Sequence, residues 1–197
     1  MTYLVFDTET NGIPFTNLPL NNIQQPNIVQ LSAILFNSQG KILNEMDTLI
    51  KPKNWNIDFE YELVHGWSVD DCEFMGIDIS DALLAFDTMC QNADLIIAHH
   101  IEFDITMLNI EAEKNKFTNR YWNNLTQFCT MKQTQNICKI PYRGNTYKYP
   151  SLNEAIKCLL GEELDPNLQH NAHYDALKTK DLFLEIKNAN HLNNFLF

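Results

Sequence analysis

The chain opens on residues 2–10, TYLVFDTET, where apolar and β-branched residues give way to acids after Phe6. This pattern predicts a buried β-strand whose carboxyl end reaches a surface. Asp7 and Glu9 are two positions apart, so on a strand both carboxylates project from the same face. Two carboxylates this close repel each other unless a cation lies between them, and Mg²⁺ and Mn²⁺ prefer such oxygen ligands. The segment therefore predicts a strand that ends at a cation site.

An Asp-x-Glu pair is a weak signal by itself. The same spacing occurs at Asp58/Glu60 and at Asp71/Glu73, where we interpret it as ordinary solvated surface. The assignment at the start of the chain therefore depends on the other acidic segments.

A second acidic position follows the apolar run at residues 95–98, which predicts another buried strand. Apolar residues then recur at helical spacing from residue 101 to residue 112. Asp104 is therefore expected in the first turn of a helix, at a strand-to-helix junction. The helix dipole alone also favours a carboxylate at that place.

A third segment, residues 168–186, carries apolar residues at helical period from Ala172 to Ile186. Asp175 lies within this predicted helix, and His170 lies in the loop just before it. A histidine five residues ahead of an aspartate is ordinary by itself. We interpret the two other histidines of this region, His173 and His191, as surface residues.

Taken together, the three segments supply Asp7, Glu9, Asp104, Asp175 and His170. Three or four carboxylates and a histidine can hold two hard divalent cations and deprotonate a water. This is the equipment of metal-assisted phosphodiester hydrolysis.

The segments FDTET, HHIEFD and HNAHYD resemble, in order, spacing and local sequence, the three motifs of the DEDDh (DnaQ-like) exonucleases. LVHGWS at residues 63–68 and YKYPSLNEAIKCLLG at residues 147–161 also resemble stretches of that family, so the resemblance covers about residues 1–187. One departure is His100, which stands where most members carry an Asn. That departure bears on a hydrogen bond to substrate or to a neighbouring group, and not on the metal ligands.

The resemblance implies a ribonuclease-H-like fold and 3′-to-5′ hydrolysis of a nucleic-acid strand to nucleoside 5′-monophosphates. It implies two Mg²⁺ or Mn²⁺ ions held by Asp7, Glu9, Asp104 and Asp175, with His170 as general base. The expected partner is a single-stranded 3′ end, with DNA favoured over RNA, and a DNA polymerase is a candidate protein partner. The residues expected to bind the terminal nucleotide are Thr8, Thr10, Gly12, Ile13, His65, His100 and Phe103. For His65, a packed histidine is an equal alternative.

Composition fits a small cytoplasmic enzyme. The 197 residues, 45% of them hydrophobic, predict a single exonuclease domain spanning 1–197 and exclude a disordered chain. A strand begins at once, so we expect no signal peptide, and no apolar stretch is long enough to cross a membrane. The five cysteines show no CxxC spacing and are interpreted as reduced thiols.

The net charge of −11 argues against nucleic-acid binding, although bound metal ions would reverse the local sign. Residues 132–157 are the exception, with five basic residues against one acid and with tyrosines interleaved in YRGNTYKYP. This pattern is typical of a single-strand track, and equally of a solvated loop with packed tyrosines.

The order of predicted elements is strand, polar loop, a hairpin that turns at Gly40–Lys41, helices, strand, helix, strand or turn, and helices. Ser80 and Ser151 are expected to cap helices, with Glu154 completing a capping box. Residues 15–27 are expected to form a loop insertion beside the site, and residues 188–197 a loosely held tail. This order fits an α/β fold with a mixed β-sheet flanked by helices.

Two other functions remain open on the residues alone. The first is a non-hydrolytic nucleic-acid-binding or polymerase-associated subunit, against which the clustered, repelling acids argue. The second is an oligoribonuclease-like RNA exonuclease, which fits the chemistry but fits the His-x4-Asp spacing less well. The sequence does not decide between DNA and RNA, between single and double strands, or between a free exonuclease and a proofreading subunit, and it leaves the oligomeric state open.

Overall fold

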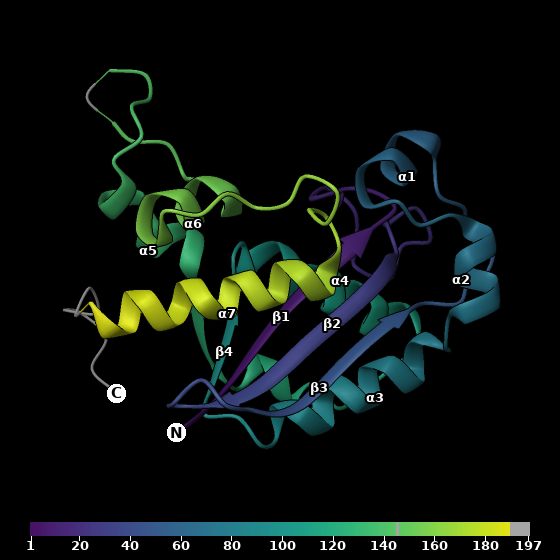
Figure 1. The fold of residues 1–197 in the computed structure, drawn as a ribbon. Helices are drawn as coiled ribbons and strands as arrows, with labels where there is room; N and C mark the ends of the chain where they lie inside the picture. Colours follow the sequence, from purple (N-terminus) through teal and green to yellow (C-terminus); the bar gives the residue numbers. More distant parts are fainter. Residues whose placement is uncertain (145, 190–197) are drawn as a thin grey trace.

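A five-stranded mixed sheet forms the centre of the computed structural model, which describes residues 1–144 and 146–189 (Figure 1). Its strands are β1 (Thr2–Thr10), β2 (Ile28–Asn37), β3 (Ile42–Leu49), β4 (Leu95–Ala98) and β5 (Thr126–Cys129), in the spatial order β3-β2-β1-β4-β5. β1, β2 and β3 pair antiparallel, whereas β4 and β5 run parallel to β1. The predicted hairpin and the mixed sheet are both confirmed.

Helices cover both faces of the sheet. They are α1 (Phe59–His65), α2 (Val69–Met75), α3 (Ile79–Cys90), α4 (Ile101–Lys114), α5 (Thr130–Cys138), α6 (Leu152–Leu160) and α7 (Ala172–Asn188), with a short 3₁₀ turn at Tyr121–Asn123. The long α7 crosses one face beside α6, and α3 and α4 pack on the other (Figure 1). Leu4 and Phe6 of β1 point toward α3 and α4, whereas Tyr3 and Val5 point toward α7. This alternation places Asp7 and Glu9 on the α7 face of β1.

The caps of two helices test the sequence patterns directly. Ser151 caps α6 and forms a capping box with Glu154, as predicted, and Gly161 ends the helix. The predicted Ser80 cap of α3 is wrong, because Asp78 caps that helix and its carboxylate accepts the Ser80 N–H. Aspartate and serine are about equally good caps, so the sequence alone did not separate the two positions.

The segment between β1 and β2 is a loop, as expected. Lys114 of α4 anchors it, since the ammonium donates to the carbonyls of Gln25 and Pro26 and to the side chain of Asn27. In the part of the chain that the structure describes, no helix is long and apolar enough to cross a membrane. Residues 190–197, most of the tail expected to be loosely held, lie outside the described residues, as does His191.

An aromatic cluster joins α7 to the sheet. The ring of Phe183 lies 5.0 Å from Tyr3, 6.1 Å from Phe36 and 5.1 Å from Phe128, measured between centroids. All four side chains are fully buried. This contact fixes how α7, which carries Asp175, lies on β1.

We predict that Phe183→Ala lowers the free energy of unfolding by about 3–5 kcal/mol, because it removes a fully buried ring and leaves a cavity. Urea unfolding followed by circular dichroism measures the change. Leu184→Ala, on the less buried side of the same helix, is the control and should cost less. A loss below about 1 kcal/mol for Phe183→Ala would mean that α7 does not depend on this cluster.

Candidate active site

The carboxyl end of β1 projects beyond its neighbour in the sheet. β4 pairs only with residues 3–5 of β1, so Asp7 and the residues after it have no strand on that side. The chain leaving β4 passes through His99 and His100 and enters α4, whose first turn fills this place. The overhang brings Asp104 of α4 to the strand end that carries Asp7 and Glu9.

Thr8 holds Asp104 in position. Asp104 is buried, and its Oδ1 accepts hydrogen bonds from the backbone N–H of Thr8 at 3.2 Å and from the Thr8 hydroxyl at 2.8 Å. Thr8 was expected to contact the terminal nucleotide. Its side chain is buried against α4, where it orients Asp104, and its contact with the terminal nucleotide stays a prediction.

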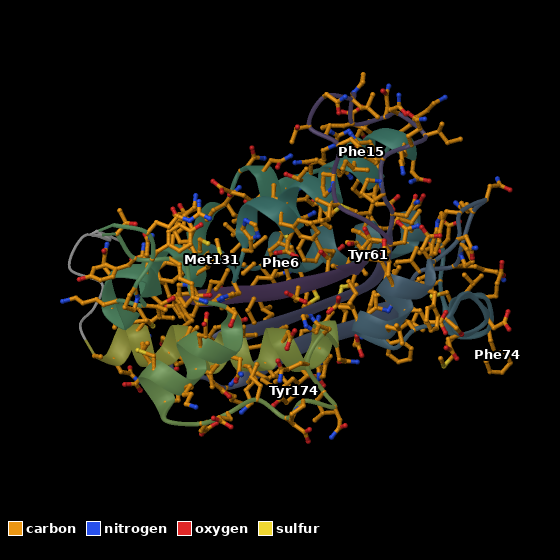
Figure 2. All side chains as sticks on the ribbon, turned by 90° about the horizontal axis from the view of Figure 1, so that it is seen from above. Phe6, Phe15, Tyr61, Phe74, Met131 and Tyr174 are labelled. Atoms are coloured by element: carbon orange, nitrogen blue, oxygen red, sulfur yellow. The ribbon has the colours of Figure 1, made fainter. Side chains whose placement is uncertain are left out.

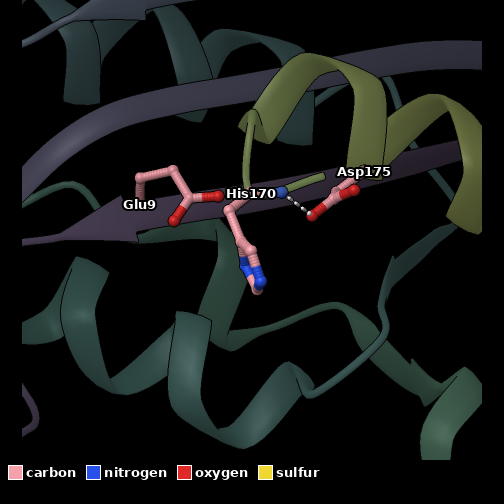
Figure 3. A group of neighbouring side chains, drawn as sticks. All are labelled: Glu9, His170 and Asp175. Carbon is pink, nitrogen blue, oxygen red and sulfur yellow. Dashed lines mark hydrogen bonds between the residues drawn. The ribbon is translucent and has the colours of Figure 1, made fainter. Parts of the chain in front are cut away.

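Glu9, His170 and Asp175 come together at the same strand end (Figure 3). One ligand atom of each lies within 4.8 Å of the other two, although His170 and Glu9 are far apart in the chain. The backbone N–H of His170 donates to Asp175 Oδ2 at 3.1 Å, which ties the loop to the helix that follows it. His170 has φ +60°, an uncommon conformation for a non-glycine residue that histidine adopts more readily than most residues.

The carboxylates of the site perturb one another. Burial, together with the charges of Asp104, Glu9 and Asp175, raises the pKa of Asp7 well above its ordinary value. Burial and the charges of Asp175 and Asp104 raise the pKa of Glu9 to about 8. Burial also raises the pKa of Asp104 to about 7 and that of Asp175 to about 6, even though hydrogen bonds from Thr8 and His170 act in the opposite direction.

The donor set fits a hard divalent cation. Asp175 Oδ1 is buried and has no hydrogen-bond partner among the described residues, so this residue keeps a buried acceptor that is available to a ligand. Carboxylate oxygens are the ligands that Mg²⁺ and Mn²⁺ prefer. A cation would also offset the mutual repulsion that, together with burial, raises the pKa values of Asp7 and Glu9.

His65 lies at this site as a neutral hydrogen-bond donor. Its Nδ1 accepts the backbone N–H of Trp67 at 3.1 Å, so the proton of the neutral ring is on Nε2. Nε2 is buried and has no partner among the residues described. Burial, with a smaller contribution from His170, lowers the pKa of His65 to about 4. A buried, unpaired N–H beside His170 is suited to contact a substrate.

The remaining substrate-binding candidates divide by exposure. Ile13 is 69% exposed, and the exposed ring of His100 stacks on Phe103 with a centroid distance of 6.1 Å. Thr10 is buried and its hydroxyl donates to the carbonyl of Gly12, which shapes the turn that presents Ile13. Ile13, His100 and Phe103 therefore offer surfaces for a base, whereas Thr10 and Gly12 form the backbone turn.

A groove of about 530 Å³ continues from this turn, between the loop after β1 and residues 54–61. Phe15 and Tyr61 contribute aromatic side chains to its lining (Figure 2). Asp58 and Glu60, the pair interpreted as solvated surface, are exposed and also line this groove. Its polar groups are amides and acids, so the groove is poorly suited to hold a phosphate backbone.

The prediction of His173 as a surface histidine is wrong. It is half-buried, and its Nδ1 lies 3.1 Å from the hydroxyl of Ser32 on β2. Sequence reasoning also missed Ser32 and Gln30, two polar residues in the buried strand β2. The break that they make in the apolar pattern was the signal that could have identified them. His99, in contrast, is packed between the hydroxyl of Thr130 and the carbonyl of Pro150.

The basic stretch at residues 132–157 has a mixed outcome. Its tyrosines Tyr142, Tyr147 and Tyr149 are exposed rather than packed. However, Lys132, Lys148 and Lys157 form ion pairs with Glu102, Glu154 and Glu163. The loop projects beyond α5 and α6, apart from the carboxyl end of β1 (Figure 1). The stretch therefore has free aromatic faces, but most of its lysines are neutralised.

Comparison with known proteins agrees with this geometry. The profile of the exonuclease family RNase_T matches residues 4–183. The chain therefore belongs to this exonuclease family, and its mixed sheet with flanking helices has the ribonuclease-H-like fold. The resemblance to the DEDDh (DnaQ-like) family is confirmed.

The individual proteins that match this chain have low sequence identity to it and are much longer than it is. The chain is 26% identical to the PolC-type DNA polymerase III of Streptococcus mutans, over 99% of this chain and 12% of that protein. The structure of E. coli exonuclease I in complex with a dA16 oligonucleotide matches 98% of this chain, with a TM-score of 0.75 and 14% identity. Exonuclease I from Methylocaldum szegediense matches with a TM-score of 0.71 and 12% identity. The chain spans 42% and 40% of these two exonucleases.

We predict that the metal-free protein loses stability as pH rises from about 6.5 to 8. The raised pKa values mean that the folded site keeps protons which the unfolded carboxylates, with pKa near 4, have already lost. The contribution of these carboxylates to stability is then greatest below about pH 4 and falls as the folded groups ionise. His65 and His99, whose pKa burial lowers to about 4, act in the opposite direction, but only below about pH 6.5.

The measurement is thermal unfolding in EDTA across this pH range, with and without added Mg²⁺ or Mn²⁺. The metal should recover stability at pH 8, because it binds the folded site. Asp7→Asn is the control: it should flatten the pH dependence and raise the metal-free melting temperature at pH 8. Glu111, whose pKa burial raises to about 7, contributes equally to both proteins and cancels. If the melting temperature of the wild type depends on pH as little as that of Asp7→Asn, the proposed interaction among the four carboxylates is contradicted.

Proposed function

We propose that this chain is a metal-dependent 3′-to-5′ exonuclease that releases nucleoside 5′-monophosphates from a nucleic-acid strand. The observation that supports it most is the meeting of Glu9, His170 and Asp175 at the end of β1, beside Asp7 and Asp104, in a chain of an exonuclease family. We also propose that residues 1–197 form one exonuclease domain, and the sheet drawn from residues 2–129 with α7 packed on it supports this.

In this proposal Asp7, Glu9, Asp104 and Asp175 hold two Mg²⁺ or Mn²⁺ ions. When bound, the ions supply the positive charge that offsets the scissile phosphate and favours ionisation of water. His170 takes a proton from the attacking water on its imidazole. The oxygen of that water bonds to phosphorus as the bond to the 3′ oxygen breaks, and the leaving 3′ oxygen takes a proton from solvent. The products are a nucleoside 5′-monophosphate and a shortened strand with a free 3′ hydroxyl.

The proposed substrate is the 3′ end of a single strand, with DNA favoured over RNA. Ile13 and the stacked pair His100 and Phe103 offer apolar faces to the terminal base, and His65 Nε2–H donates to the nucleotide. Oligonucleotide complexes of exonuclease I, one of them with dA16, support the choice of single-stranded DNA. Hydrolysis of an RNA oligonucleotide in preference to DNA would favour the oligoribonuclease-like alternative.

A role beside a polymerase is a second candidate, because a PolC-type polymerase III matches nearly the whole chain. A purely non-hydrolytic role is disfavoured, because a binding module has no need of four mutually repelling carboxylates. We further propose a cytoplasmic location, which the five free thiols in the described residues support.

We predict hydrolysis from the 3′ end that stops in EDTA and returns with Mg²⁺ or Mn²⁺, with Ca²⁺ supporting little turnover. Ca²⁺ accepts looser coordination than an in-line displacement requires. The measurement uses DNA and RNA oligonucleotides, single-stranded and paired, labelled at the 5′ end so that 3′ shortening gives a ladder. Full activity in EDTA, or immediate release of the label, would contradict the proposal.

We predict that His170→Ala lowers kcat by about 10²–10⁴, the usual cost of losing one general base. Divalent-metal affinity should change little, because the four carboxylates remain. His100→Asn, which restores the residue most common in the family, is the matched comparison and should be mild. A large kcat loss for His100→Asn with a mild effect for His170→Ala would move the base to His100.

A further inference from the structure

Gln30 is a buried amide at the centre of three elements. It lies on β2 directly opposite Glu9 of β1, so the two side chains share one face of the sheet. Its Oε1 accepts from Trp67 Nε1 at 2.9 Å and from the backbone N–H of Ala172 at 3.0 Å. Its Nε2 donates to Asp47 of β3 at 2.8 Å. Gln30 therefore connects the sheet both to the segment after α1 and to the start of α7.

Ser32, the next residue on the same face of β2, makes a parallel contact. It lies opposite Asp7, and its hydroxyl contacts His173 in the first turn of α7. Two side chains of β2, each facing a carboxylate of β1, therefore hold the amino end of α7. The carboxylates of β1 and the helix that carries Asp175 are fixed against the same strand.

The two partners of Gln30 Oε1 adjoin the two histidines of the site. Ala172 is two residues after His170, whose loop conformation has positive φ and whose side chain is exposed. Trp67 is two residues after His65, and its backbone N–H fixes the His65 ring through Nδ1. The Gln30 amide oxygen thus holds both the segment that follows His65 and the segment that follows His170.

We propose that Gln30 is a positioning residue, which places His170 and His65 relative to the carboxylates through Ala172 and Trp67. This inference depends on the proposed exonuclease function, because it assigns Gln30 a role in that reaction. Both polar atoms of the Gln30 amide are engaged by Trp67, Ala172 and Asp47, so in this proposal Gln30 acts through these partners and not on the reacting atoms. Its loss should therefore misplace His170 while Asp7, Glu9 and Asp104, held by β1 and by α4, keep their arrangement. Asp175 is kept in place by the packing of Phe183, further along α7, against the sheet.

The chemistry of the amide defines the variants. Gln30→Met has a similar length but leaves Trp67 Nε1–H and the Ala172 N–H without an acceptor. Gln30→Glu with Asp47→Asn keeps all three contacts and the total charge, because Glu accepts from Trp67, from Ala172 and from the Asn side chain. Gln39→Met makes the same substitution at the exposed end of the same hairpin and is the control.

The experiment measures kcat and KM on a single-stranded oligonucleotide at saturating Mn²⁺, Mn²⁺ affinity by calorimetry, and stability by urea unfolding. Gln30→Met should lower kcat by about 10–100-fold, a common cost of losing a supporting partner at a metal site, with Mn²⁺ affinity nearly unchanged. Gln30→Glu with Asp47→Asn should recover kcat to within a few fold of wild type. Trp67→Phe removes only the contact near His65 and should raise KM more than it lowers kcat.

Each contrary result has a distinct meaning. If the wild type is active and Gln30→Met has the same kcat, the positioning role of Gln30 is overturned and the proposed exonuclease function is not. A parallel fall in kcat and Mn²⁺ affinity would also overturn it, because Gln30 would then only maintain the fold. If Gln30→Met does not fold, the folded double variant decides, because it keeps both Oε1 contacts, and a fall of its kcat to less than about a tenth of the wild-type value overturns the proposal. A wild type that shortens no oligonucleotide would refute the proposed function itself.

Discussion

Mutual repulsion among four carboxylates at the end of β1 is the constraint on which the rest of the structure depends. Asp7 and Glu9 share a strand face, Asp104 arrives from α4, and Asp175 arrives from α7. Without a cation such a cluster tends to open, so the surrounding fold must hold it closed. The hydrogen bonds of Thr8 to Asp104 and the aromatic contacts of Phe183 oppose that tendency from opposite faces of the sheet.

The two faces of the sheet make different contributions. On the α4 face, Asp104 is buried and accepts hydrogen bonds from Thr8 of β1, so its position is fixed. On the α7 face, His170 is exposed and depends on the anchored start of the helix. A metal ligand needs a fixed position, whereas a proton acceptor must also reach water and substrate. The difference in burial therefore agrees with the proposed difference in role.

The helices, the strands and the acidic residues of the candidate site could be predicted because residues close together in the sequence indicate each of them. Alternation and apolar runs marked the strands, helical spacing placed Asp104 and Asp175, and Ser151 with Glu154 marked a cap. The prediction failed where a partner distant in the chain decides the outcome. His173 contacts Ser32 across 141 positions, and Gln30 contacts Ala172 across 142. Nothing local to any of these four residues indicates its partner, and Gln30 shows only as a polar residue in an otherwise buried strand.

The distribution of charge links metal binding to strand binding in the proposed function. No Lys or Arg occurs between Lys53 and Lys114, a range that supplies α1, α2, α3 and most of α4. Lys132, Lys148 and Lys157 are already paired with acids. A phosphate brought to the end of β1 therefore finds four carboxylates and few neighbouring cations, and bound metal ions would be its main source of attraction. Because binding free energies are reciprocal, a strand whose affinity rises with metal must raise the affinity for metal equally. The acidic protein would then hold both tightly only when both are present, and would have little affinity for nucleic acid without the metal.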